Sequence, residues 1–407
     1  MRIVPTVAVV VLAAASSLLI SRPAVAAGAI PTFKVDQIDK SLTIGYAVSL
    51  VDINGDGKLD VVVVDKDRVI WFENPTWKMR TVMSGQKALD NVCLDAYDID
   101  GDGQLDLALG AGWKPGNTKT PSTLQWYGRG KSLDESWQEH RINYDEPTLH
   151  RMRWADLDGS GKKVLITVPL TGRDSTNAKN WSEAGVRMQA RHVPKDPTQA
   201  DWPTDLITDA LHVPHNFQVV NVSGERRPEI LVASYEGVSL LSKGGDKWDI
   251  AKLGEGDQAN PMKNRGSSEI KLGKLKNGTR FIATIEPWHG NQVVVYTQPA
   301  GGKDWKRQVL DNQLMWGHAV QVADLDGDGD DELVIGVRDP LKGKAESGVR
   351  VYKADASAEK WERSELDPGG VAVEDAAVAD LNGDGKPDIV AVGRATKNVR
   401  IYWNQGK

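Results

Sequence analysis

The stretch AVQVADLDGDGDDELVIG, residues 319–336, decides the fold, because two short apolar segments flank a loop of aspartate and glycine. Residues 319–323 and 332–336 have the length and composition of β-strands joined by a tight turn. Similar loops, some of them degenerate, begin at seven places in the chain: Asp52, Asp98, Asp156, Asn221, Lys274, Asp324 and Asp380. A unit that returns at intervals of 46 to 65 residues predicts a repeat architecture.

Two further strands follow the loop in each unit, and the last of them begins at a tryptophan with an apolar residue five positions later. This pair occurs in six units: Trp77 and Val82, Trp137 and Ile142, Trp202 and Ile207, Trp248 and Leu253, Trp305 and Leu310, Trp361 and Leu366. The seventh unit ends after residues 398–404 without such a strand, while Phe33 and Ile38 have the same spacing near the N-terminus. The sequence therefore predicts an all-β, seven-bladed β-propeller in which the N-terminal strand closes the last blade.

The N-terminal residues have the features of an export signal. Arg2 precedes an apolar stretch over residues 3–20, and Ala24 and Ala26 form a small-residue cleavage site. We therefore expect a signal peptide at 1–26, a propeller domain at 27–407, no transmembrane segment in the mature chain, and a secreted or periplasmic protein. The net charge of -6 argues against a nucleic-acid partner, and the single cysteine excludes an intrachain disulfide.

Four of the aspartate loops carry oxygen ligands at positions one, three, five and nine. Glycines between the ligands permit the backbone angles that aim oxygen atoms at one hard cation. We therefore predict about four structural Ca²⁺ ions. The four ligand sets are Asp52, Asn54, Asp56 and Asp60; Asp98, Asp100, Asp102 and Asp106; Asp324, Asp326, Asp328 and Glu332; and Asp380, Asn382, Asp384 and Asp388.

The face of the propeller opposite these loops collects the unusual side chains. The sixth position before each loop gives one residue per blade, and these residues are expected to form a ring at the channel mouth: Tyr46, Val92, His150, His215, Ser268, His318 and Glu374. The loops that leave the second strands add candidates for substrate binding: Trp113, Lys114, Arg173, Glu236, Glu286 and Trp288. An aromatic face and several charged groups suit a sugar.

These repeats resemble the FG-GAP, or VCBS, repeats of integrin-α-like propellers. A second resemblance, to the propeller domain of aldos-2-ulose dehydratase, lies in EPTLHRMRW (146–154), VPLTGR (168–173), HNF (215–217), RGSSE (265–269), IEPWHGN (285–291), GHAVQVADLDGDG (317–329) and VRDP (337–340). This resemblance implies a lyase that eliminates water from a keto-sugar.

A carbohydrate lyase of this kind needs a base beside the sugar carbonyl and positive charge near the carbonyl oxygen. We predict His150 as the base, with His289 as the alternative. His215, His318, Glu269 and Glu374 are the predicted ligands of a divalent metal, which the sequence leaves open between zinc, manganese and magnesium. Arg153 or Arg338 would stabilise the oxygen if no metal binds.

Two other functions remain open from the sequence. One is a noncatalytic calcium propeller that binds glycan or protein, which predicts similar shallow pockets between the blades. The other is a lyase of uronate-containing polysaccharides, which would share the histidine base but needs a long open groove. The marked differences among the ring residues favour one central site.

Overall fold

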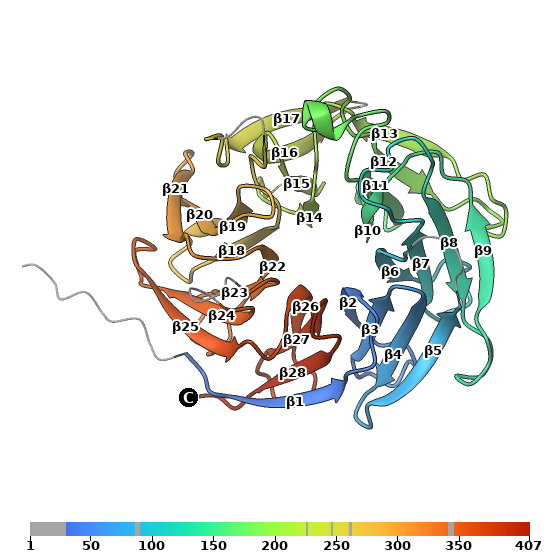
Figure 1. The fold of residues 1–407 in the computed structure, drawn as a ribbon, viewed down its shortest axis with the longest axis horizontal. Coiled ribbons are helices and arrows are strands. Elements are labelled where there is room, and N and C mark those ends of the chain that lie inside the picture. Colours follow the sequence, from blue (N-terminus) through green and yellow to red (C-terminus); the bar gives the residue numbers. More distant parts are fainter. Residues whose placement is uncertain (1–29, 86–89, 225–226, 246, 260–262, 341–345) are drawn as a thin grey trace, which may run out of the picture.

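The computed structural model describes residues 30–407 apart from 86–89, 225–226, 246, 260–262 and 341–345. This part of the chain forms seven four-stranded antiparallel sheets arranged around a central axis (Figure 1). The predicted seven-bladed propeller is thus confirmed. The predicted signal peptide at 1–26 lies outside the described residues. Within the described residues, no helix has both the length and the hydropathy required to cross a membrane.

Each blade uses its strands in sequence order from the axis outward. The innermost strands are β2 (Gly45–Val51), β6 (Cys93–Tyr97), β10 (Leu149–Ala155), β14 (Asn216–Val220), β18 (Ile270–Lys274), β22 (Gly317–Ala323) and β26 (Val373–Ala379). The second strands are β3 (Asp60–Asp65), β7 (Asp106–Ala111), β11 (Val164–Pro169), β15 (Glu229–Ser234), β19 (Arg280–Glu286), β23 (Glu332–Val337) and β27 (Asp388–Gly393).

The third strands are β4 (Arg68–Glu73), β8 (Thr123–Gly128), β12 (Met188–His192), β16 (Gly237–Gly244), β20 (Gln292–Gln298), β24 (Gly348–Ala354) and β28 (Val399–Asn404). The outer strands are β5 (Lys78–Ser84), β9 (Gln138–Ile142), β13 (Thr204–Thr208), β17 (Lys247–Gly254), β21 (Lys306–Asp311) and β25 (Trp361–Pro368), with β1 (Phe33–Asp39) completing the last blade. One short 3-10 helix, η1 (Asn177–Lys179), lies between β11 and β12.

Closure of the ring occurs as predicted. β1 pairs antiparallel with β28, with Phe33 opposite Asn404 and Lys34 opposite Trp403, and the two strands run side by side at the edge of the ring in Figure 1. The Trp403 indole N–H also donates to the Asp36 carboxylate at 2.9 Å. The edge of β28, which would otherwise be exposed, is therefore covered by the other end of the chain.

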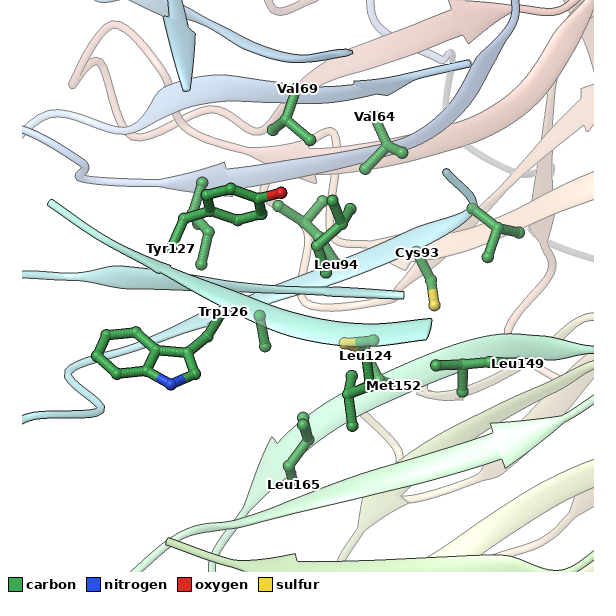
Figure 2. Close-up of a cluster of buried hydrophobic side chains, with 14 of the residues drawn as sticks. Val64, Val69, Cys93, Leu94, Leu124, Trp126, Tyr127, Leu149, Met152 and Leu165 are labelled. Carbon is green, nitrogen blue, oxygen red and sulfur yellow. The ribbon is translucent and has the colours of Figure 1, made fainter. Parts of the chain in front are cut away.

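The core lies between neighbouring blades. Second strands such as β3 are buried at every residue, since both faces of each sheet pack on another blade. Figure 2 shows one such region, where Val64 of the first blade, Leu94 of the second and Leu149 of the third belong to one apolar cluster. Cys93 is buried in the same cluster, which raises the pKa of its thiol. This packing holds the inner strands, and hence the residues at the channel mouth, in fixed positions.

Candidate functional site

The residues predicted to form a ring at the channel mouth lie at a β-bulge in four of the seven blades. In four blades the strand register shifts between the residues that flank the ring position, so that Tyr46, His150, His318 and Glu374 each lie at a β-bulge. A bulge leaves one residue out of the pairing and redirects its side chain. His215 directly precedes β14, and its amide donates to the carbonyl of Ala233 at 3.0 Å.

Four histidines gather at this mouth of the channel. The ring centroids of His150 and His215 lie 4.6 Å apart, and His289 lies 4.6 Å from His215 and 4.7 Å from His318. Ring nitrogens of His215, His289 and His318, one from each, lie within 4.8 Å of one another. We call these three residues the histidine triplet. The structure thus brings His289 together with the two histidines that were predicted as metal ligands.

The loop after β19 delivers His289. Its backbone turns through a positive φ of 49° at His289, and the imidazole stacks on Trp288 with centroids 4.0 Å apart. A Cβ atom on Gly290 would lie 2.3 Å from the carbonyl oxygens of Glu286 and Pro287, so this close fold of the loop requires glycine. His289 Nε2 reaches His215 Nε2 at 2.8 Å.

Main-chain acceptors set the tautomers of two histidines. His150 Nδ1 lies 3.1 Å from the carbonyl oxygen of His215, and His318 Nδ1 lies 2.6 Å from that of Glu374. A carbonyl oxygen can only accept a hydrogen bond, so each Nδ1 carries the proton and each Nε2 keeps a lone pair. Neutral imidazoles of this kind are suited to act as bases or metal ligands.

The electrostatic surroundings keep these imidazoles neutral. Burial, followed by the Arg151 guanidinium, holds the pKa of His150 well below that of free imidazole. Burial and Arg338 lower the pKa of His318 to about 3. The pKa values of His215 and His289 are also lowered well below normal, mainly by burial.

Glu269 supports His215. One of its carboxylate oxygens lies 2.8 Å from His215 Nδ1, although the angle is poor for a hydrogen bond, and its other oxygen accepts from the Asn216 amide. Arg151 lies 3.5 Å from the same carboxylate and 3.4 Å from His150 Nε2. Glu269 is therefore placed behind a histidine, where a carboxylate typically orients a metal-binding imidazole.

The carboxylate of Glu374 pairs with two arginines. Its carboxylate accepts from Arg394 at 2.7 Å and lies 3.6 Å from Arg338, while its main-chain oxygen binds His318. Arg338 in turn lies over the ring of Trp316, 5.0 Å from the centroid, and Trp316 is 5.5 Å from His289. The predicted carboxylate ligands thus surround the histidine triplet but do not belong to it.

The residues present fit a divalent metal. Three neutral imidazoles are a frequent ligand set for zinc, and one ring nitrogen from each of the three histidines lies within 4.8 Å of the other two. His289 Nδ1 is buried without a hydrogen-bond partner among the described residues. Outer partners for two of the three rings, Glu269 and the Glu374 carbonyl, are also in place.

The other predicted site residues differ in burial and in the groups that they contact. Trp113 packs on His150 with ring centroids 5.0 Å apart, and Trp288 is half-buried against His289. Arg153 faces a channel cavity of about 250 Å³ that Asp95, Gln321 and Asp375 also line. Lys114 is exposed, and Arg173 contacts the carbonyl of Asp145 on the loop before β10.

Two predicted substrate residues, one partly buried and one fully buried, are hydrogen-bonded to other residues of the chain. Glu236 binds both the main-chain N–H and the imidazole of His212, each at 2.9 Å. Glu286 is fully buried, where it accepts from the Tyr296 hydroxyl at 2.8 Å and from Arg307 at 2.7 Å. Burial raises the pKa of Glu286, against the opposing effect of Arg307. Both carboxylates hold neighbouring segments together.

Glu286→Ala is expected to lower the free energy of unfolding by about 3 kcal/mol, because it leaves the Tyr296 hydroxyl and Arg307 without their acceptor. Chemical denaturation measures this loss, and Glu286→Gln, which keeps an acceptor of similar size, should lose less. Unchanged stability together with weakened sugar binding would instead place Glu286 in the substrate site.

Three residues of the site were not predicted as members of it: Arg151, Trp316 and Arg394. Arg394 directly follows β27, as Arg338 directly follows β23, so the register rule that identified Arg338 could have found it. Trp316 lies two positions before His318 in the sequence. Arg151 lines the same channel cavity as Arg153 but is two residues closer to the ring position, where it reaches His150 and Glu269.

The aspartate loops have the predicted backbone form. In the loop that starts at Asp98, Gly101 and Gly103 have φ values of 77° and 87°, and both donate to the Asp98 carboxylate. Carboxylate oxygens lie within 4.8 Å of one another in two loops, at Asp98, Asp100 and Asp106, and at Asp324, Asp326 and Glu332. The ninth residues are buried and also cap the turn, as when Asp60 accepts from the amide of Ile53.

Comparison with known proteins agrees with both resemblances. Residues 122–299 match the family described as aldos-2-ulose dehydratase, β-propeller domain, and residues 52–109 and 316–349 match FG-GAP repeat families. Aldos-2-ulose dehydratase of Phanerodontia chrysosporium is 28% identical over 234 residues. This match covers 52% of the present chain and 25% of the fungal protein.

Solved structures share the fold at low sequence identity. BBS1N in its complex with ARL6DN has a TM-score of 0.53 at 13% identity, covering 92% of this chain and 98% of that one. A lectin of Agrocybe aegerita that recognises non-reducing terminal N-acetylglucosamine has a TM-score of 0.50 at 13% identity, covering 80% and 81%. The chain is therefore a seven-bladed β-propeller that is similar to FG-GAP repeat proteins in two segments and, over about half of its length, to aldos-2-ulose dehydratase.

Proposed function

We propose that this protein is an exported carbohydrate lyase that removes water from a keto-sugar by abstracting the proton next to the carbonyl group. The observation that carries the proposal is the proximity of His150 to the histidine triplet at one channel mouth, within four segments that resemble the dehydratase. Three of the four histidines, His150, His215 and His289, lie inside the region matched to that family.

His150 is the proposed base. Its Nδ1 proton is held by the His215 carbonyl, and its Nε2 lone pair, which an Arg151 guanidinium nitrogen approaches at 3.4 Å, is the proposed acceptor of the proton from the carbon next to the sugar carbonyl. The C–H electron pair forms the new C=C bond as the carbonyl becomes an enolate. When the carbonyl re-forms, the hydroxyl on the β-carbon leaves and takes the proton from His150. The products are an enone and water.

Positive charge and aromatic surface surround this base. Arg151 lies beside His150 Nε2, and Arg338 lies 3.6 Å from Glu374, whose main-chain oxygen binds His318. Either guanidinium would stabilise negative charge on the carbonyl oxygen. A divalent metal on His215, His289 and His318 would act as a Lewis acid toward the same oxygen. Trp288, which is half-buried against His289, would provide a face for a sugar ring, while Trp113 is buried and packs on His150.

We also propose that the loops that begin at Asp52, Asp98 and Asp380 hold structural Ca²⁺. Their aspartate and asparagine oxygens occupy the same loop positions, and oxygen ligands of this number suit calcium better than they suit softer metals. These loops lie at the end of the blades opposite the histidines, so their ions would stabilise the turns and take no part in the reaction.

The decisive experiment incubates the protein with 2-keto and 3-keto sugars and follows the ultraviolet absorbance of the enone product. We expect absorbance to rise with time and protein concentration. Uronate oligosaccharides form a parallel arm, and a rise confined to them would assign a uronate lyase. Saturable sugar binding without product in either arm would show the noncatalytic binding propeller and would contradict the lyase.

A further inference from the structure

The sixth-blade aspartate loop, residues 324–332, differs from the other loops because a lysine enters it. The ammonium group of Lys353 lies 2.9 Å from Asp328 Oδ2 and 2.9 Å from Glu332 Oε1, and it also contacts Asp326. The Lys353 side chain is only 3% exposed. Its charge is therefore neutralised inside the loop rather than in solvent.

This ammonium group lies where the loop would hold a metal. Asp326, Asp328 and Glu332 are the third, fifth and ninth positions, three of the four predicted calcium ligands. The carboxylate oxygens of Asp324, Asp326 and Glu332 lie within 4.8 Å of one another, close enough to surround a single cation. An ammonium ion and Ca²⁺ at contact distance repel each other, so the loop has room for one of them.

The residue at one equivalent sheet position distinguishes this loop from the other three with complete ligand sets. Lys353 follows Tyr352, which pairs with Leu333, the residue after the ninth loop position. The equivalent pairs are Val61 with Phe72, Leu107 with Tyr127, and Ile389 with Tyr402. The residues that follow in those blades are Glu73, Gly128 and Trp403, none of which carries a positive charge.

A second amine strengthens the same contact. Lys407 Nζ lies 2.9 Å from the Asp326 carboxylate that Lys353 contacts. Asp324, by contrast, is used by the backbone, since its two oxygens accept from the amides of Asp328 and Gly329 at 3.0 and 2.9 Å. In Asp326, Asp328 and Glu332, one carboxylate oxygen accepts from a backbone amide and the other contacts a side-chain ammonium group.

We propose that Lys353 is the resident cation of the sixth-blade loop, which folds without calcium and leaves three calcium-dependent loops in the protein. The number of calcium-dependent loops, three, rests on the calcium sites proposed above for the other loops. The replacement itself concerns Lys353 and its three carboxylate partners.

The test is Lys353→Met, which removes the ammonium group and keeps the length of the side chain. After equilibration with calcium and removal of the unbound ion, elemental analysis should find one more calcium per chain than in the wild type. The melting temperature of the variant should fall below that of the wild type in chelator and should recover when calcium is added.

Lys386→Met is the matched control, because Lys386 also lies beside a loop carboxylate, 3.3 Å from Asp384, but is 43% exposed. This variant should keep the calcium content of the wild type. If Lys353→Met folds poorly, Lys353→Gln prepared in excess calcium provides the same count.

Equal calcium content in the wild type and both Lys353 variants would overturn the replacement, whatever the absolute number. A wild type without calcium whose Lys353→Met variant gains one ion would support the replacement while contradicting calcium in the other three loops. The two proposals therefore fail separately.

Discussion

His150→Ala is expected to reduce the rate of elimination by about 10²–10⁴-fold while leaving the metal content of the protein unchanged. His150 is held by the His215 carbonyl and lies next to the histidine triplet, yet it is not one of the three residues whose nitrogens converge. Removing its imidazole therefore removes the proposed proton acceptor but no ligand. Turnover of a keto-sugar, together with elemental analysis of the purified variant, measures both effects.

Variants of the triplet provide the contrast. His215→Ala and His318→Ala should lose both metal and activity, because each removes a converging nitrogen. His192→Ala is the matched control, since His192 is 46% exposed and pairs with Asp205 on the outer part of the third blade. Near-normal turnover in His150→Ala would assign the base to another residue, and loss of metal from it would make His150 a ligand.

A chain that lacks residues 30–40 is expected to lose more than about 4 kcal/mol of unfolding free energy, or to fail to fold. The deletion removes β1, which pairs with β28 over most of its length, and the hydrogen bond from Trp403 to Asp36. It also exposes the edge of β28 and uncovers the apolar cluster on which Phe33 packs. Thermal and denaturant unfolding measure the loss.

Val35→Thr provides a control on the same strand, since Val35 is 40% exposed and its replacement keeps a β-branched side chain. Its effect should stay within about 0.5 kcal/mol. A synthetic peptide of residues 30–40 added to the truncated chain should restore part of the stability by pairing with β28. Unchanged unfolding after the deletion would show that ring closure by β1 contributes little.

The sequence alone determined the blade number and the closure, because both depend on local patterns. Strand alternation, the glycines of the aspartate loops and the tryptophan spacing repeat with the blades, and the one missing outer strand identified Phe33 to Ile38 as its replacement. The ring register that places His150, His215 and His318 at one mouth follows from the same repetition. A symmetric ring converts equal position within a repeat into proximity across the channel.

The tertiary structure alone decided which side chains meet. His289 joins the triplet because Gly290 allows its loop to fold back, and the buried carboxylate of Glu286 accepts a hydrogen bond from Arg307. Lys353 is 29 residues after Asp324 and reaches its loop only through the pairing of β23 with β24. Loop direction and cross-strand register depend on contacts between distant segments, and no local pattern encodes them.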